Sequence, residues 1–515
     1  MNITVVCPPI EDFYFTPHRG APLGASIVCE LIREAGHHPR LLYLPGTGKP
    51  RNVPISPSLE YLKDLIIPDE NGPLSFFTRR KRYGPGVEQS AQRIADTSPD
   101  IIMVSCFAYA YADHALKLIK SAREMLPDCP VLVGGAGASV FPGFFLQPGG
   151  AHGVIRGEAE TSLPGFFSLL GDRRDPDSVR RCVEELPNGT VQPDQDIAHE
   201  PPLPADASQI RPACLQSTRS KRFVQFSASL SRGCPMHCSF CSCELTHGRG
   251  FRLPDLEDSF RTISSCIRAY PLRGRYASLN IEDDNLLADP PYLLALVSRL
   301  SKAFPGIRFT AENGIDYRLL TPEIVQKMIH MGFYSWNLSA GIIPQDLSYR
   351  NRRSQSLDHL EQLCNLISYH GVPAVVYAII GAPGDSRELS LSSLRFLRSL
   401  PARPGISPFY ALPGLKQFQD GSRFMFDSPD RCCGSSLYPW SGALNSRELV
   451  TLFRLSRLIQ LEKAPYRSQE EQHLLDTVID QKKLHTWIRG QSGPIPLSND
   501  HADGQLVELF LDGGC

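Results

Sequence analysis

Short apolar segments alternate with amphipathic helical segments along most of the chain, and this alternation limits the possible folds more than any other feature. Near the N-terminus, residues 3–6 and 40–44 predict strands, with a helix between them over residues 22–38. Residues 100–105, 130–135 and 153–155 predict further strands. Short buried strands separated by helices are typical of a parallel sheet with helices on both faces. We therefore expect a doubly wound, Rossmann-like α/β domain over residues 1–195.

A second and longer series of strands and helices occupies residues 222–430. Its six predicted strands lie at residues 224–230, 278–282, 307–311, 335–339, 374–380 and 405–411. Six units are too few for a closed eightfold barrel but fit a partial (β/α)6 barrel of the TIM type, with functional groups at the carboxyl ends of the strands. The polar, proline-rich stretch from about residue 171 to residue 221 predicts a linker with one small element, which follows or overlaps the end of the N-terminal domain. Residues 431–515 predict a mainly helical C-terminal segment that caps the barrel mouth.

Charge and hydropathy exclude several classes of partner. The 53 Lys and Arg residues balance 54 Asp and Glu residues, so no basic field favours nucleic acid. The longest nearly apolar run, residues 101–112, is too short to span a bilayer. The chain opens without the pattern of a signal peptide, so we expect a cytoplasmic protein. In that reducing compartment, clustered cysteines indicate a metal site more often than a disulfide.

Three cysteines directly after the first predicted barrel strand form the strongest chemical motif. Cys234, Cys238 and Cys241 have C-x3-C-x2-C spacing. Three thiolates in one loop can bind three irons of a [4Fe-4S] cluster and leave the fourth iron open to a small molecule. The alternative is a structural zinc site, or thiols without a metal. Cys243 could complete a four-thiolate zinc site, although its C-x-C spacing fits tetrahedral zinc poorly.

This loop, at the top of the first strand of a six-unit barrel, resembles the radical S-adenosylmethionine (radical SAM) superfamily. The resemblance implies that the open iron binds SAM and that one-electron reduction cleaves SAM to a 5′-deoxyadenosyl radical. It also implies SAM contacts near Phe240, near the second strand in IEDDN, near the fourth strand in NLSAG, and in YAIIGAPGDS after the fifth strand. Asp385 stands where this last motif usually has Glu. The expected SAM-binding residues are Phe240, Glu282, Asp283, Ser339, Ile380 and Gly381.

The N-terminal half resembles the cobalamin-binding domain of class B radical SAM enzymes, on the segments PLGASIVCELIREAGHHPRLLYL, DIIMVSCF, PVLVGGAGASVFP and GVIRGEAET. The resemblance implies bound cobalamin, whose nucleotide tail would lie near the glycine turn. Residues expected to contact cobalamin are Ser105, Gly134, Gly135, Gly137, Gly157 and Glu158. The D-x-H-x-x-G motif that places a histidine below cobalt is absent, and His18 has the wrong spacing to replace it. The alternative is a doubly wound domain with no ligand.

Together these resemblances imply a cobalamin-dependent radical SAM methyltransferase. It would transfer a methyl group to a carbon or phosphorus centre of a small molecule or natural product, with a flavodoxin- or ferredoxin-type reductant as its external electron donor. One alternative keeps the cofactors but carries out a rearrangement, cyclisation or ring modification. Another is a non-catalytic protein stabilised by its metal. Cys432, Cys433 and Cys515 lack ligand-like spacing and are expected to be incidental.

Overall fold

The N-terminal domain contains the expected parallel sheet. A computed structural model describes residues 1–15, 21–66, 79–192, 197–353, 356–418, 423–464, 469 and 472. The strand order is β3-β1-β6-β7-β8-β9, parallel except for the last pair. The strands are β1 (Asn2–Cys7), β3 (His38–Tyr43), β6 (Ile101–Ser105), β7 (Val131–Gly134), β8 (Gly153–Ile155) and β9 (Gly189–Thr190). The prediction of a doubly wound α/β domain is confirmed.

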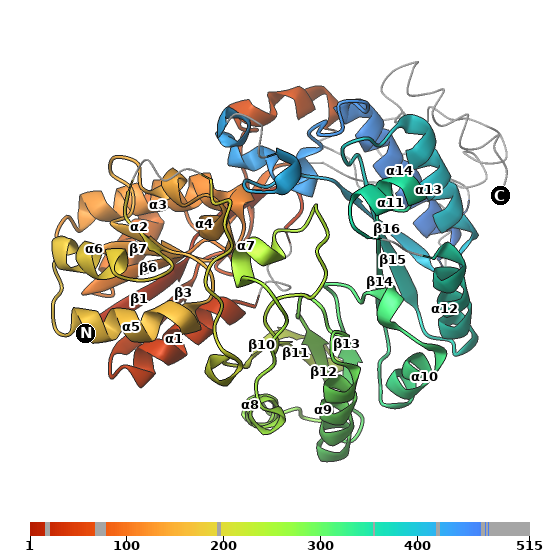
Figure 1. Cartoon of the computed structure of the whole chain (residues 1–515), viewed down its shortest axis with the longest axis horizontal. Coiled ribbons are helices and arrows are strands. Elements are labelled where there is room, and N and C mark those ends of the chain that lie inside the picture. Colours follow the sequence, from red (N-terminus) through yellow and green to blue (C-terminus); the bar gives the residue numbers. More distant parts are fainter. Residues whose placement is uncertain are drawn as a thin grey trace.

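Helices cover both faces of this sheet (Figure 1). The first layer comprises α1 (Leu23–Glu34), α5 (Ala159–Leu170) and α6 (Pro176–Glu184), which share one apolar core with Ile3, Val5 and Ile101. The second comprises α2 (Val87–Ala95) and α3 (Ala112–Met125), packed on Val6 and Ile102. Alternate residues of β1 and β6 thus face opposite layers, as the pleat requires. Because β1 and β6 are buried on both faces, their sequences are continuous apolar runs and not alternating ones.

The chain changes direction in this sheet between β1 and β6. From β1 it crosses to β3 on one side, and it returns to β6 on the other side. Ligands of doubly wound sheets bind beyond the carboxyl ends of the strands at such a switch point. Here these ends are Cys7 and Ser105. The chain continues from β1 into a small antiparallel sheet. This sheet consists of β2 (Ile10–Asp12), β4 (Arg51–Asn52) and β5 (Lys81–Tyr83).

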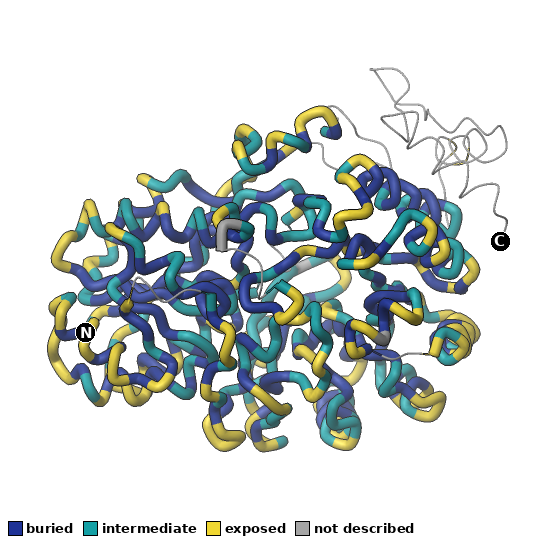
Figure 2. The backbone as a smooth tube through the Cα atoms, turned by 45° about the horizontal axis from the view of Figure 1, so that its top comes forward, coloured by how far each residue is buried: buried dark blue, intermediate teal, exposed yellow. Residues whose placement is uncertain are grey.

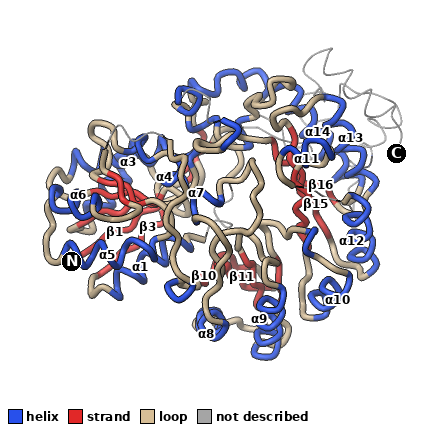
Figure 3. Tube along the Cα trace, viewed as in Figure 1, coloured by secondary structure: helices blue, strands red, loops and turns tan. Residues whose placement is uncertain are grey.

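The second half forms the partial barrel (Figures 1 and 3). All six predicted strands are present: β11 (Phe223–Ser229), β12 (Tyr276–Ile281), β13 (Arg308–Thr310), β14 (Trp336–Gly341), β15 (Ala374–Ile380) and β16 (Arg403–Pro408). They run parallel within two sheets. Isolated parallel bridges, Phe309 to Phe333 and Ile315 to Leu338, join the sheets. The connecting helices are α7 (Cys243–His247), α8 (Leu256–Arg268), α9 (Pro290–Ala303), α10 (Pro322–His330), α11 (Gln345–Arg350), α12 (Leu357–Tyr369) and α13 (Arg387–Ser399).

The region expected to be a linker contains more structure than its composition predicted. Besides α6 and β9, it holds β10 (Ala213–Arg219), which pairs antiparallel with β11 and extends the barrel sheet by one strand. Its sequence, ACLQSTR, has no apolar alternation, because it lies at the edge of the sheet. Its pairing comes from backbone hydrogen bonds that the sequence pattern does not reveal.

Side chains of the barrel strands alternate between two environments. In Figure 2 the exposed stretches of the tube lie mainly at the periphery of the molecule and the buried stretches mainly inside it. One set, which includes Phe226, Leu279 and Leu338, is fully buried against the surrounding helices. In β11 and β12 the alternate residues are mostly polar. They include Ser227 and Asn280, both at most 3% exposed.

The C-terminal segment begins with short 3-10 turns and continues in α14 (Ser446–Glu462). Asn445 caps this helix, and Glu448 completes a capping box. The helix packs on β16 and α13, at the open edge of the barrel. The predicted helical character is therefore present over 446–462, while Cys515 lies outside the described residues. No helix in the described part of the chain has the length and apolarity needed to cross a membrane.

Candidate functional site

The loop that carries the three predicted cluster cysteines begins directly after β11 and is fixed at its root by Asp283. This carboxylate is 5% exposed. One oxygen accepts from the Leu230 N–H at 2.7 Å, and the other accepts from the Ser231 N–H at 3.0 Å and the Ser231 hydroxyl at 2.7 Å. Both oxygens of Asp283 are thus used by the protein. Its expected contact with SAM stays a prediction, while its hold on the loop is visible.

Hydrogen-bond donors from distant segments converge on the thiols. Cys234 Sγ accepts from the Met236 N–H at 3.4 Å and from Asn285 Nδ2 at 3.5 Å. Cys238 Sγ accepts from the guanidinium of Arg353 at 3.7 Å. Burial raises the pKa of the Cys234 thiol, and the donors from Asn285 and Met236 oppose that rise. Such donors stabilise a thiolate and its metal bond, so the loop fits a thiolate-bound cluster.

Arg353 is a residue that sequence reasoning missed. Its side chain is 7% exposed and donates to the carbonyl oxygens of Ser339 at 2.5 Å and Ala340 at 3.3 Å. It also lies 3.4 Å from a carboxylate oxygen of Asp316. A single cation thus ties the end of β14 to the cysteine loop. Nothing in the local sequence NRRSQS distinguishes it from its exposed neighbour Arg352.

The thiols do not form a site for a single ion. In the segments described, no three His, Cys, Asp or Glu side chains converge in a way that could hold one metal ion. A cubane cluster asks for a different arrangement, because each thiolate binds a different iron. Cys241 is exposed, and Phe240 beside it is partly buried against the apolar core between barrel and N-terminal domain.

Cys243, the fourth cysteine of the motif, belongs to a separate network. Its Sγ lies 3.4 Å from a carboxylate oxygen of Asp284, and the same oxygen is 3.4 Å from His247 Nε2. The other ring nitrogen of His247 is 3.1 Å from Glu158 Oε1. Arg252 also binds Glu158, at 2.9 and 3.0 Å. The network therefore connects the cysteine loop to the N-terminal domain.

Glu158 and Gly157 were predicted to contact cobalamin, and the structure gives both a protein neighbour instead. Glu158 also accepts from the Ala205 N–H at 2.8 Å, so both oxygens of its buried carboxylate are bonded. Burial alone would raise the pKa of Glu158, but its bonds to His247, Ala205 and Arg252 outweigh burial and lower the pKa. Gly157 has φ of +75°, and a Cβ there would lie 2.8 Å from Pro202. Their contact with cobalamin stays a prediction, and their visible role is to join the domains.

A second and more deeply buried ion pair lies next to this network. Arg232, two residues before Cys234, is bound to Glu160 of α5 at 2.7 Å, and both side chains are at most 4% exposed. Arg232 also donates to the carbonyl oxygens of Arg211 and Ser231, each at 2.9 Å. A buried guanidinium needs this number of acceptors to offset the loss of water. The root of the cysteine loop is thus fastened to a helix of the other domain.

Glu282 and Ser339, two of the expected SAM-binding residues, each lie at the carboxyl end of a barrel strand. Glu282 follows β12, accepts from Asn280 Nδ2 at 3.1 Å, and has its pKa raised by burial. Ser339 of β14 is adjacent, across Gly314, to Tyr377 of β15. These side chains come from three strands far apart in the sequence. Contact of Glu282 and Ser339 with SAM stays a prediction.

The turn after β15 shows what the Asp-for-Glu departure does. The carboxylate of Asp385 accepts from the N–H groups of Gly381 at 2.7 Å and Ser386 at 2.9 Å, and from the Ser390 hydroxyl at 2.9 Å. Two features favour glycine at position 381. Its φ is +74°, and a Cβ there would lie 2.8 Å from Leu449 of α14. Ile380 is buried on the side of the strand that faces the helices. Asp385 thus closes the turn.

The glycine turn of the N-terminal domain packs closely against the backbone of the loop after β6. A Cβ on Gly135, whose φ is +97°, would lie 2.6 Å from the Cys106 carbonyl oxygen, and one on Gly137 would lie 2.6 Å from Ala108. Gly134 ends β7, next to Ser105, which ends β6. The turn therefore packs against the loop after β6. A contact of these four residues with cobalamin remains a prediction.

One cavity connects the switch point of the N-terminal sheet with the barrel. It has a volume of about 600 Å³ and lies between the loops after β1 and β6, the strands β15 and β16, and α14. The cysteine loop contributes Ser242. At the switch-point end, aromatic side chains dominate, which fits the flat face of a macrocycle. They are Tyr14, Phe107, Tyr109, Tyr111 and Tyr410.

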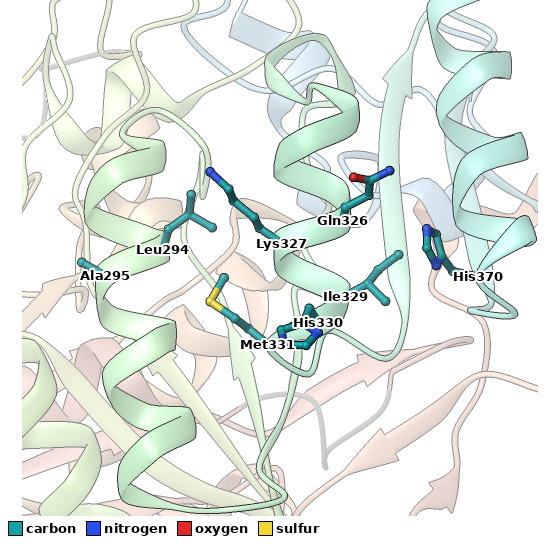
Figure 4. Close-up of a pocket in the computed structure, with 8 residues that line it drawn as sticks. All are labelled: Leu294, Ala295, Gln326, Lys327, Ile329, His330, Met331 and His370. Carbon is teal, nitrogen blue, oxygen red and sulfur yellow. The ribbon is translucent and has the colours of Figure 1, made fainter.

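A hollow elsewhere on the barrel does not qualify as the site. It has a volume of about 830 Å³ and lies on the outer face, between α9, α10 and the end of α12. Figure 4 shows Lys327 and Met331 facing Leu294, with His370 on the opposite side. It lies between these outer helices, away from the carboxyl ends of the strands where barrel sites occur.

The fold and the site define a class of protein in which a ligand-binding parallel-sheet domain faces a cysteine-bearing partial barrel. Residues 74–167 match the B12-binding domain family. The hopanoid C-3 methylase of Methylococcus capsulatus is 28% identical over 244 residues, covering 46% of this chain and 38% of that protein. The cytidylyl-2-hydroxyethylphosphonate methyltransferase of Streptomyces wedmorensis is 20% identical over 403 residues, covering 70% and 69%.

Among solved structures, the radical S-adenosylmethionine methyltransferase TsrM of Kitasatospora setae, with tryptophan and a SAM analogue bound, covers 100% of this chain. This chain covers 95% of it, with a TM-score of 0.60 and 15% identity. At that identity the agreement is one of fold. The chain thus shares its fold with this enzyme, and residues 74–167 within that fold match the B12-binding domain. The chain spans well under half the length of the hopanoid methylase.

Proposed function

We propose that this protein is a cobalamin-dependent radical SAM methyltransferase acting on a small molecule. The observation that carries the proposal is a cavity lined by residues at the switch point of the N-terminal domain, by Ser242 next to Cys241, and by the strands β15 and β16. Two cofactors held at its borders and a substrate inside it would meet without any large movement. Methyltransferases among the relatives of the chain support the same reaction class.

Each element of the cavity has a role in this reaction. Cys234, Cys238 and Cys241 would hold the [4Fe-4S] cluster. When bound, the cluster supplies an electron to SAM, and cobalamin carries a methyl group to the substrate. Glu282 and Ser339 would orient SAM at the ends of the strands. The aromatic side chains at the switch point would pack on the corrin and exclude water, which protects reactive species from side reactions.

Cobalamin should bind without a histidine from this protein beneath cobalt. Among the described residues that line the cavity there is no histidine, and His18 lies outside the described residues. We expect the electron paramagnetic resonance spectrum of cob(II)alamin in this protein to lack the splitting that a coordinating imidazole nitrogen causes. A His18→Ala variant should give the same spectrum. A nitrogen splitting that disappears in His18→Ala would contradict this expectation.

We further propose that an acidic electron carrier, a cytoplasmic flavodoxin or ferredoxin, docks on the outer side of the cysteine loop. There a depression of about 440 Å³ exposes Cys238 and Cys241. Its described lining has more cations than carboxylates. The cations are Arg249, Arg350, Arg352 and Lys416, and the carboxylates are Glu200 and Glu244. A positive rim around a redox centre steers an anionic partner and speeds its association.

Charge reversal at this rim tests the docking face. The double variant Arg350→Glu, Lys416→Glu should slow cluster reduction by flavodoxin about tenfold or more at low salt, and the difference should shrink at high salt. Stopped-flow absorbance measures the rate. The matched control reverses two remote exposed cations, Lys117→Glu and Lys327→Glu, and should reduce at the native rate. Equal slowing in both double variants would exclude this face.

The reaction class is tested with SAM that carries a trideuterated methyl group. Reconstituted protein, reductant and a panel of candidate small molecules are incubated anaerobically, and products are identified by mass spectrometry. Methyl transfer predicts a product that carries the label, together with S-adenosylhomocysteine and 5′-deoxyadenosine. A rearranged or cyclised product without the label would instead establish the alternative reaction.

A further inference from the structure

The end of the cavity at α14 differs from the end at the switch point. Four residues of α14 line it, at the spacing of one helical face: Phe453, Ser456, Arg457 and Gln460. Tyr377 of β15 forms the facing wall, and its hydroxyl donates to Asn337 Oδ1 at 3.2 Å. Gly405 makes room for this ring, because a Cβ there would lie 2.3 Å from Tyr377 Cδ1. The wall is thus aromatic and fixed in place.

Only two charged side chains, Asp12 and Arg457, occur among the described residues that line the whole cavity. Asp12 is bonded within the protein. Its Oδ1 accepts from the Ser435 hydroxyl at 2.6 Å and the Tyr14 N–H at 3.2 Å, and its Oδ2 accepts from the Tyr111 hydroxyl at 2.7 Å. A carboxylate bonded in this way has little capacity left for a ligand.

Arg457 is the opposite case. Gln460 holds the guanidinium, since Arg457 Nη1 donates to Gln460 Oε1 at 2.9 Å while Gln460 Nε2 donates to the Pro404 carbonyl oxygen at 2.6 Å. Arg457 Nε is buried and has no hydrogen-bond partner within the described segments. The protein therefore orients the guanidinium of Arg457 but does not supply hydrogen-bond acceptors for all of its N–H groups. The other terminal nitrogen, Nη2, makes no hydrogen bond within the described segments and is not buried, so it can donate to a ligand in the cavity.

We propose that Arg457 binds the carboxylate of the substrate and so determines which molecules the enzyme accepts. This proposal rests on the proposed function and names its substrate class: a small molecule with an aromatic or apolar body and one acid group. The body would lie against Tyr377 and Phe453, with the acid at Arg457. The reacting atom would then face the switch point and the cysteine loop. A guanidinium fork matches a carboxylate better than any neutral acceptor.

Binding of a chosen probe pair tests the proposal without turnover. The probes are 3-phenylpropionate and its neutral counterpart 3-phenylpropan-1-ol, titrated calorimetrically into protein loaded with cobalamin and cluster, in chloride buffer. The native protein should bind the acid about tenfold or more tightly than the alcohol, since hydrogen bonds to charged groups contribute that difference. Arg457→Gln should lose this preference, and Arg457→Lys should keep part of it.

The alcohol also serves as the control for folding. Arg457→Gln should bind the alcohol with native affinity and should retain cobalamin and iron, because Arg457 touches neither the cysteine loop nor the switch point. Arg299→Gln, at an exposed ion pair outside the barrel, should bind both probes like the native protein. Equal native affinity for acid and alcohol, or undiminished acid binding in Arg457→Gln, would overturn the proposal. Neither result would affect the labelled-methyl test of the reaction class.

Discussion

Each of the variants Cys234→Ala, Cys238→Ala and Cys241→Ala should lose most bound iron and all reductive cleavage of SAM. In the proposed site each thiolate would supply one of three bonds between the protein and the cluster, so the loss of one thiolate would leave an iron without its ligand. We expect the cleavage rate to fall more than about 100-fold, beyond the 10- to 100-fold range typical of residues that only support a metal ligand. Iron analysis and measurement of 5′-deoxyadenosine, both under anaerobic conditions, check this result.

Cys243→Ala is the matched control, because Cys243 lies in the same loop but is bound to Asp284. It should keep both iron and SAM cleavage. If Cys243→Ala behaves like the triad variants while one of the other three cysteines can be replaced without effect, the ligand assignment is wrong.

Arg232→Ala should destabilise the protein strongly. It leaves Glu160 as an uncompensated charge that is 3% exposed at the junction of α5 and the cysteine loop. Breaking a buried ion pair from one side costs about 3–5 kcal/mol. Thermal unfolding of protein without cofactors, followed by scanning calorimetry, should show a large fall in the transition that includes this junction.

Two controls separate this effect from a general loss of charge. Lys117→Ala breaks an exposed pair with Asp113 on α3, and should cost less than about 1 kcal/mol. The double variant Arg232→Met, Glu160→Leu removes both charges and should recover much of the lost stability, since apolar replacement of a whole buried pair is often neutral. A shift for Arg232→Ala as small as that for Lys117→Ala would show that the junction is not energetically coupled.

The architecture could be predicted because its strands are apolar runs whose period is local. Every barrel strand from Phe223–Ser229 to Arg403–Pro408 was predicted within a few residues. The edge strand β10 was not, because an edge strand needs no apolar face. The role of Cys234, Cys238 and Cys241 as cluster ligands, expected from their spacing and from the family resemblance, stays a prediction.

The neighbours of the site could not be predicted in the same way. Arg353 reaches Cys238 across 115 positions of the chain, and Arg252 reaches Glu158 across 94. Such contacts follow from the packing of two domains, which local patterns do not encode. Several residues chosen by motif, Asp283 and Glu158 above all, proved to be bonded within the protein. A motif marks a position in a fold, and packing decides what the side chain there touches.

The central claim is that one cavity brings cobalamin and the cluster together, and spin relaxation measures this directly. Protein loaded with both cofactors and reduced contains two paramagnets, cob(II)alamin and the reduced cluster. A fast-relaxing cluster near cobalt shortens the relaxation time of the cob(II)alamin signal. We predict that pulsed electron paramagnetic resonance shows this shortening in the native protein and not in Cys238→Ala with cobalamin bound. Identical cob(II)alamin relaxation in the two proteins, with the cluster signal present in the native one, would contradict the claim.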